Sequence, residues 1–237
     1  MAGHIITLID TLEDWFLRIV FVLIMLIGAY ALYDSYCVYQ AAQGRSMMAY
    51  RPVQEAGDVS PDRSFFSGDM AAWLTVFDTK IDFPVMQGDT NYEYLNKAPT
   101  GEYSVAGSIY LDSRNDMDFT DPYSLVYGHH MDGEAMFGTL DLFEDEEYFD
   151  AHRKGELITR AGTYEIEFFA FMRALASDDE VFDVDTDADR MAFIIEHSQI
   201  FREPGHEGNI IAMSTCSDSS TIARTLVFGI LKEKAND

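Results

Sequence analysis

An apolar run near the N-terminus constrains this chain more than any other feature of its sequence. From Trp15 to Tyr33 there are nineteen residues, of which Arg18 alone is charged. About 20 apolar residues in a helix span the roughly 30 Å core of a bilayer, so the run predicts a transmembrane helix within residues 15–39. A tryptophan at one end and tyrosines toward the other fit the membrane–water interface, and Arg18 lies close enough to the end for its charge to reach water.

Two other interpretations of this run stay open. A buried helix of a soluble domain has a similar composition. A cleaved signal peptide is the closer alternative, because Ala29-Tyr30-Ala31 resembles a cleavage site, although three acids and a single basic residue make a poor N-region before it. Arg45 and Arg51 follow the run, which is a weak bias toward a cytoplasmic C-terminal part.

Composition excludes several classes of protein. The 237 residues include 16 Lys and Arg against 41 Asp and Glu, a net charge of -25, so nucleic acid is not an expected partner. An aromatic share of 14% excludes a disordered chain, and two cysteines cannot form a disulfide scaffold. We therefore expect an N-terminal tail over residues 1–14, the anchor over 15–39, a partly helical linker over 40–70 and a folded domain over 71–237.

Short β-type runs separated by turn residues predict that this domain is mostly β, a sandwich or a barrel of about eight strands. The runs are Trp73–Phe77, Phe83–Gln87, Gly107–Leu111, Ser124–Tyr127, Glu156–Thr159, Tyr164–Leu175, Asn209–Thr215 and Arg224–Lys232.

Two segments between these runs have helical spacing, Phe137–His152 and Ala188–Phe201. In the second, one face is expected to carry Met191, Ile194, Ile195 and Ser198. Thr186-Asp187-Ala188-Asp189 fits a capping box at its start. In the acidic stretch Asp178–Asp189, the acids Asp183, Asp185 and Asp187 have the spacing of positions 1, 3 and 5 of a calcium loop. The loop fails, because Ala188 stands where it needs glycine and Ile194 where it needs glutamate.

Three residues that can do chemistry stand at strand ends. Cys216 closes an apolar run before a polar, serine-rich segment, where a substrate can reach a thiol; a buried, inert cysteine is the other interpretation. His129 ends the run that starts at Tyr123, where an imidazole can act as acid or base. Arg224 begins the last strand, and a hairpin would return it beside Cys216 to hold a carbonyl oxygen; an exposed edge arginine is the alternative.

The surrounding residues narrow the chemistry. Adjacent side chains of an extended chain point to opposite faces, so His129 and His130 are not expected to bind zinc together, and no metal or cofactor is predicted. His129 precedes Cys216 by 87 residues, whereas papain-like enzymes have the cysteine first, so that class is excluded. The residues before Cys216 are Ser-Thr rather than the Gln-Ala of caspases. The sequence also lacks the nucleophile elbow of serine hydrolases and the phosphate-binding loop of NTPases.

Several motifs in order resemble the class B sortases over most of the chain after the linker, from Trp73 to Lys232. The motifs are Ile81–Gly88, Gly107–Asp112, the Tyr127-Gly128-His129-His130-Met131 segment, Met136–Leu140, the Ser214-Thr215-Cys216 strand end and the Arg224 strand. The resemblance implies an eight-stranded sortase-type β-barrel with peripheral helices after an N-terminal transmembrane helix. It also implies a single-pass protein of the Gram-positive cell membrane, with a cytoplasmic tail over residues 1–14 and an extracellular catalytic domain. This orientation is opposite to the one that the weak bias from Arg45 and Arg51 favours.

The resemblance further implies a cysteine transpeptidase. Cys216 would attack the carbonyl after Thr in the C-terminal sorting signal of a secreted protein, His129 would move the protons and Arg224 would stabilise the oxyanion or anchor the signal. Ser214 and Thr215 are expected substrate contacts by family position. The acceptor would be an amine of a cell-wall precursor or of a pilin. A thiol peptidase that hydrolyses the acyl enzyme and a non-catalytic β-domain that binds surface partners are the alternatives.

Overall fold

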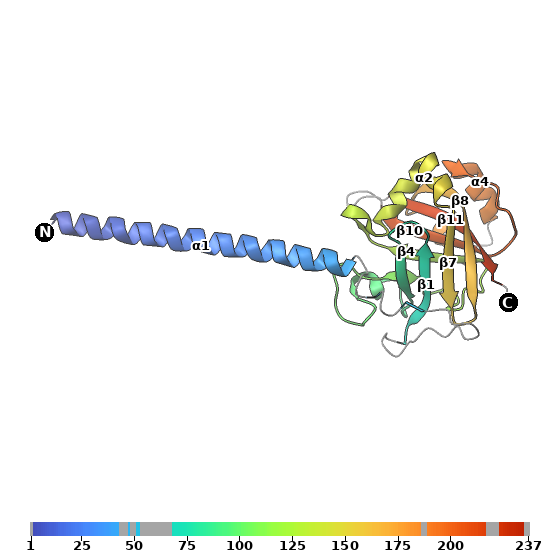
Figure 1. Ribbon diagram of the computed structural model, residues 1–237, viewed down its shortest axis with the longest axis horizontal. Helices are drawn as coiled ribbons and strands as arrows, with labels where there is room; N and C mark the ends of the chain where they lie inside the picture. The colour runs from blue at the N-terminus through green and yellow to red at the C-terminus, as the bar shows by residue number, and fades with distance from the viewer. Residues whose placement is uncertain are drawn as a thin grey trace. The chain divides into compact units, whose positions relative to one another are not determined.

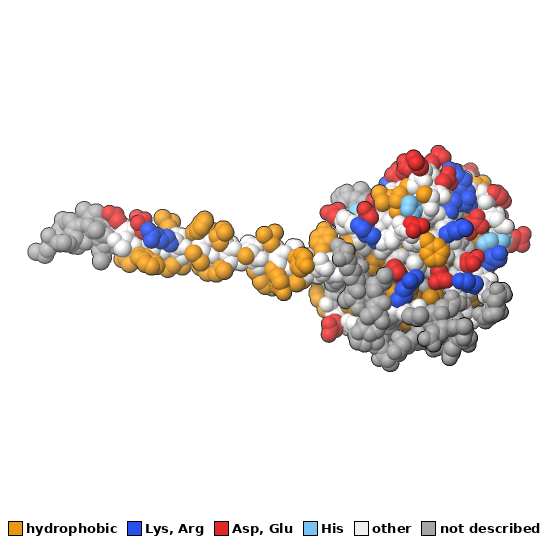
Figure 2. All heavy atoms as spheres, viewed as in Figure 1, with side chains coloured by type: hydrophobic (Ala, Val, Ile, Leu, Met, Phe, Trp, Pro, Cys, Tyr) orange, Lys and Arg blue, Asp and Glu red, His pale blue; other side chains and the backbone are white. Residues whose placement is uncertain are grey.

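The computed structural model describes residues 2–42, 47, 51–52, 68–185, 189–216 and 223–234. The chain divides into two compact units, residues 1–40 and residues 41–237. The first unit is helical: α1 runs from Ala2 to Ala42, so the segment expected to be a tail continues the same helix. Within it, Ile9–Gln40 is long and apolar enough to cross a membrane, with none of its most apolar window buried. Figure 2 shows apolar side chains along this helix.

The second unit is a closed β-barrel of eight strands (Figure 1). The order around the barrel is β11-β10-β4-β3-β2-β1-β7-β8, and pairing of β8 with β11 closes it. The bounds are β1 Met70–Val76, β2 Asp82–Met86, β3 Ile109–Leu111, β4 Tyr123–Gly128, β7 Lys154–Thr159, β8 Thr163–Leu175, β10 Ile210–Cys216 and β11 Ala223–Glu233. Each overlaps one of the eight predicted runs, so the predicted barrel is confirmed.

Most neighbouring strands are antiparallel, but β10 runs parallel to β4 and β2 parallel to β3. The longest strand, β8, pairs with β11 along almost its whole length. Its other edge pairs with β7 over the first half and with the short strand β9, Ile200–Phe201, over the second. β9 is therefore an addition to the barrel, outside the ring of eight.

Side chains alternate between the inside of the barrel and its outer surface. The inner cluster draws residues from all eight strands, among them Val126, Met213 and Val227. Their chain neighbours Leu125, Ala212 and Leu226 belong to a second, outer cluster that the helical segment near Ile194 covers. A strand buried on both faces reads as a continuous apolar run, which explains why the strands around Cys216 were found as unbroken runs rather than as alternating ones.

The first predicted helical segment, Phe137–His152, is confirmed as two short helices. They are η4, Gly138–Glu144, and α2, Glu146–Ala151. Leu140, Phe143 and Phe149 are fully buried and join the inner cluster, so this segment closes one end of the barrel. The other short elements before β7 are η2 Tyr94–Asn96, β5 His130–Met131, η3 Asp132–Glu134 and β6 Ala135–Met136.

The second helical segment is shorter than predicted. After the one-turn helix α3, Asp179–Phe182, helix α4 covers Arg190–His197, and the remainder becomes β9. Asp189 caps α4 by accepting from the Ala192 amide at 3.1 Å, whereas the start of the proposed capping box, residues 186–188, lies outside the described residues. Ile194 is buried but Ile195, one step around the helix, is 51% exposed, so the predicted apolar face was too wide.

Candidate active site

The register of three strands brings the predicted site residues together in the backbone. Cys216 is the partner of Arg224 in the antiparallel β10–β11 pair. On the other side, Thr215 pairs with Gly128 in the parallel β10–β4 pair, and His129 is the next residue after Gly128. The end of β10 therefore lies between the start of β11 and the residue that follows β4.

Strand alternation places these positions on one face. Position 216 belongs to the same set as Ala212 on β10, and Arg224 to the same set as Leu226 on β11, both of which lie in the outer cluster. The predicted site therefore belongs to the outer surface at a strand-end edge of the barrel. The side chain of Cys216 and residues 217–222 lie outside the described part of the chain.

Glycine at position 128 is required by close packing. A Cβ atom there would lie 2.5 Å from Ile109 Cδ1 and 2.7 Å from Phe137 Cδ2. The same region holds the next residue in place, because the Phe137 amide donates to the His129 carbonyl at 3.1 Å. The Gly-His sequence thus fixes the backbone from which the imidazole extends.

The His129 ring is oriented by a backbone carbonyl. Nε2 donates to the Leu95 carbonyl oxygen at 2.8 Å, and the ring is half-buried. Because a carbonyl can only accept, this contact places the proton of the neutral imidazole on Nε2 and leaves Nδ1 as the acceptor. Leu95 was not predicted, since any residue type offers the same carbonyl and only its place in η2 distinguishes it.

Aromatic side chains lie beside the arginine. Burial raises the pKa of Tyr110 to about 12, and the positive charge of Arg224 opposes this rise. The ring of Tyr110 packs on that of Tyr127 with centroids 5.4 Å apart. Arg224 itself is half-buried. A positive charge therefore stands at this edge of the site beside an apolar wall.

A buried carboxylate supports this wall from behind. Asp112 is fully buried and accepts from Arg114 Nε at 3.0 Å, from Asn91 Nδ2 at 2.8 Å and from the Tyr127 hydroxyl at 3.2 Å. Burial alone would raise the pKa of Asp112, but the hydrogen bonds and charge of Arg114 and the bond from Asn91 hold it below its usual range. Asn91 lies four residues before Leu95, so the network anchors the loop that orients His129.

The two predicted substrate contacts are buried within β10. Ser214 is fully buried and Thr215 is 2% exposed. The Ser214 hydroxyl finds no hydrogen-bond partner among the described residues. Their role in substrate binding stays a prediction.

Two acids of the stretch before α4 have an arginine as their partner. Asp183 accepts from Arg114 Nη1 at 2.8 Å, and Asp185 lies 3.8 Å from the same nitrogen. Across the described residues, no group of three or more His, Cys, Asp or Glu side chains could hold a metal ion.

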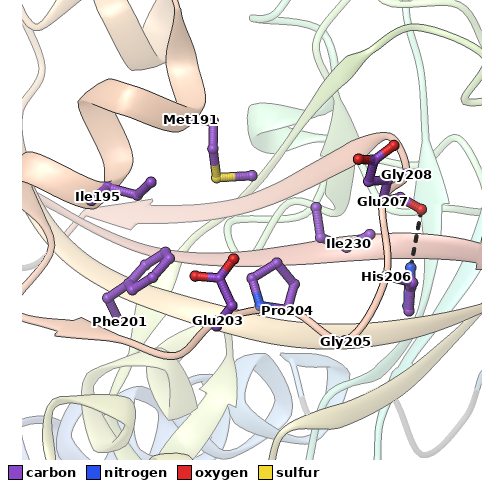
Figure 3. A pocket seen from close by; sticks show the side chains of 10 residues that line it. All are labelled: Met191, Ile195, Phe201, Glu203, Pro204, Gly205, His206, Glu207, Gly208 and Ile230. Atoms are coloured by element: carbon purple, nitrogen blue, oxygen red, sulfur yellow. Dashed lines mark hydrogen bonds between the residues drawn. The ribbon is translucent and has the colours of Figure 1, made fainter.

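A separate hollow of about 360 Å³ lies between α4 and the segment after β9 (Figure 3). Its lining is Met191, Ile195, Phe201, Glu203, Pro204, Gly205, His206, Glu207, Gly208 and Ile230. In Figure 3, His206 points away from the apolar side chains and bonds the Glu207 carbonyl, so it is not aimed at this hollow. Its lining includes none of His129, Ser214, Thr215 and Arg224, the predicted site residues whose side chains the structure describes.

Comparison with known proteins decides the family. No protein-family model matches the chain. Sortase B of Staphylococcus aureus is 28% identical to this chain, in an alignment that covers 67% of this chain and 68% of the relative. Sortase B of Listeria monocytogenes is 36% identical, in an alignment that covers 49% of this chain and 47% of the relative. A crystal structure of a Streptococcus pyogenes class B sortase shares 38% identity, with a TM-score of 0.65, over 72% of this chain and 95% of that one.

The chain belongs to the class B sortases. The fold agrees, since the crystal structure of Staphylococcus aureus sortase B superposes with a TM-score of 0.71 over 83% of this chain and 98% of that one, at 24% identity. In this class B sortase, His129 directly follows β4, Cys216 is the last residue of β10 and Arg224 is the second residue of β11.

Proposed function

We propose that this class B sortase is a membrane-anchored cysteine transpeptidase with Cys216 as nucleophile, His129 as acid and base and Arg224 as the oxyanion or substrate anchor. The observation that carries the proposal is the strand register. Cys216 pairs directly with Arg224 on β11, and β4, which pairs with the other edge of β10, ends one residue before His129.

In the first half-reaction, the Cys216 thiolate attacks the carbonyl carbon that follows the Thr side chain in a sorting signal. The tetrahedral oxyanion is stabilised by the Arg224 guanidinium. The carbon–nitrogen bond then breaks, and the leaving amine takes a proton from the His129 imidazolium. Because Nε2 is engaged with Leu95, the proton is delivered from Nδ1. The product is a thioester on Cys216.

In the second half-reaction, an incoming amine gives its proton to His129 Nδ1 and attacks the thioester carbon. The carbon–sulfur bond breaks and Cys216 leaves as a thiolate. The secreted protein is thereby joined to the amine of a cell-wall precursor or of a pilin. The Streptococcus pyogenes class B sortase with 38% identity is described as involved in pilus biogenesis, which supports a pilin amine as one of the two acceptors.

The apolar helix supports the proposed location. Ile9–Gln40 would cross the cell membrane once, with the barrel on the extracellular side where secreted proteins carry their sorting signals. Long domains cross membranes largely regardless of flanking charge, so Arg45 and Arg51 do not oppose this orientation.

The test compares amine transfer with hydrolysis. The full chain in detergent is incubated with a panel of Thr-containing sorting peptides, with and without an amine acceptor peptide, and the products are separated by mass. A transpeptidase gives the amine-joined product in preference to the free acid. A predominance of free acid at saturating amine supports the thiol peptidase instead, and uncleaved peptide across the panel supports the binding domain.

A further inference from the structure

A carboxylate on the inner side of the barrel end bonds the chain neighbours of two proposed site residues. Asp141 lies on η4, between buried residues of the segment that closes the barrel, and is itself 29% exposed. Its Oδ1 accepts from the Thr225 hydroxyl at 2.7 Å, and its Oδ2 accepts from His130 Nε2 at 3.0 Å.

Both partners stand next to site residues in the chain. Thr225 follows Arg224 on β11, and His130 follows His129 after β4. Thr225 is fully buried and belongs to the inner set of β11, whereas Arg224 belongs to the outer set. Asp141 therefore holds, from the inside, the two backbone segments that present the imidazole and the guanidinium on the outside.

The other charged groups at this position leave both bonds intact. Arg173 Nη2 is 4.0 Å from Asp141 Oδ1 but bonds Glu144 at 2.7 Å. The Asp141 carboxylate can only accept, so the Thr225 hydroxyl and His130 Nε2 are both donors. Hydrogen bonds to an ionised oxygen are stronger than neutral ones, and two of them at strand ends oppose the fraying expected there.

We propose that Asp141 is a positioning residue of the transpeptidase, joining the end of β4 to the start of β11 across the barrel end. The proposal rests on the function proposed above. A misplacement of about 1 Å in a reacting group can lower a rate as much as a hundredfold, so a contact that never touches substrate can control turnover.

The test uses variants of the full chain in detergent. Asp141→Asn keeps the size of the side chain, but it removes the negative charge and replaces one of the two acceptor oxygens by an NH2 donor, so the two charge-assisted bonds cannot both form. Thr225→Val keeps the shape and loses the hydroxyl, while Thr225→Ser keeps the hydroxyl and loses a methyl. On the Thr-containing peptide that the wild type cleaves fastest, we expect kcat to fall about tenfold in Asp141→Asn and Thr225→Val with KM within about twofold, and Thr225→Ser to stay close to wild type.

Glu144→Gln is the matched control, because it removes a negative charge from the same helix and the same Arg173 without touching Thr225 or His130. Wild-type kcat in Asp141→Asn, or equal losses in Thr225→Val, Thr225→Ser and Glu144→Gln, would overturn the proposal. Equal losses in these three variants would reflect a general loosening of η4 or of β11.

A second readout separates this proposal from the proposed function. The rate of Cys216 alkylation by iodoacetamide is followed against pH by peptide mapping, which reads Cys37 separately. If the wild type cleaves no peptide, the transpeptidase assignment fails on its own. The positioning role still predicts that the midpoint of the alkylation profile shifts by about half a pH unit or more in Asp141→Asn and Thr225→Val but not in Glu144→Gln. An unchanged midpoint would overturn it.

Discussion

His129 Nε2 donates to the carbonyl oxygen of Leu95 across 2.8 Å, a contact between two residues 34 positions apart in the chain. It fixes both the orientation of the ring and the nitrogen that carries the proton in the neutral form. The free nitrogen, Nδ1, is then the one that can exchange protons with an amine. This contact separates a positioning role for the ring from its role in proton transfer, and the two can be tested apart.

Replacing His129 by glutamine is expected to keep the first role and remove the second. The amide nitrogen of Gln can still donate to the Leu95 carbonyl, but a side-chain amide cannot give or take a proton at physiological pH. We expect peptide cleavage to fall by about 10²–10⁴-fold, with a thermal unfolding midpoint close to that of the wild type. His197→Gln, at an exposed histidine of α4, is the control and should retain activity. Activity within tenfold of wild type in His129→Gln would exclude this residue as the acid and base.

Arg224 is expected to act through its charge and through its planar donors together. In Arg224→Ala we expect kcat to fall by about 10²–10³-fold, as when an oxyanion donor is removed, and in Arg224→Lys to recover only in part because the forked geometry is lost. Steady-state kinetics of peptide cleavage measures both. Equal activity of the lysine variant and the wild type would leave charge alone as the contribution, and an active alanine variant would remove Arg224 from the mechanism.

Gly128→Ala is expected to destabilise the barrel. The new methyl group would approach Ile109 and Phe137 far inside contact distance, and both neighbours are buried. Overpacking of this kind costs about 1–3 kcal/mol of the free energy of unfolding. Gly68→Ala is the control, because a Cβ there meets nothing within 4 Å. Denaturant unfolding followed by tryptophan fluorescence should separate the two variants. Equal stability would show that Ile109 and Phe137 can move to make room for the new methyl group.

Asp112 predicts a pH dependence with a definite sign. Its pKa is lower in the folded protein than in the unfolded chain, so its ionised form stabilises the fold above the unfolded pKa of about 3.9, and this stabilisation is lost as pH falls through the folded value. Asp112→Asn should therefore destabilise the protein by about 1–3 kcal/mol at pH 7.

The difference between Asp112→Asn and the wild type should shrink as the pH falls below about 4, where the Asp112 carboxyl of the unfolded chain begins to take up a proton. Unfolding free energies measured at several pH values give the curve. Asp89→Asn, at an exposed carboxylate, supplies the baseline. A difference that stays constant from pH 7 to pH 3 would show that the hydrogen-bonded charge of Asp112 is not what stabilises this network.

The strands could be predicted because each is a local pattern. The runs that end at Gly128 and Cys216 are apolar on both faces and bounded by turn residues, so their limits are visible in the sequence. Helix α4 was predicted too long, since the same apolar residues that suit a helix also suit β9, and pairing with β8 decides between them. The place of a residue within its strand could be predicted from the sequence, whereas the strand that pairs with it is decided by the whole barrel.

The supporting residues of the site were not predictable in the same way. Leu95 contributes a carbonyl, which every residue type has, and its place opposite His129 depends on the path of a loop. Asp141 and Asp112 are two among many acids in a chain of net charge -25, and nothing in the local sequence distinguishes them from the acids that have no such partners. Their partners lie 84 and 15 positions away at Thr225 and Tyr127, and only the closed barrel brings them together.

The central claim is that the ends of β4 and β10 and the start of β11 form one site, in which the substrate transfers its acyl group to the sulfur of Cys216. The direct measurement is mass spectrometry of the full chain after brief incubation with Thr-containing sorting peptides and acid quenching, followed by mapping of the modified peptide. The account predicts an acyl fragment ending in Thr on Cys216, absent from Cys216→Ala and cleared by an added amine. Peptide cleavage that persists in Cys216→Ala, or an acyl group mapped to another residue, would contradict it.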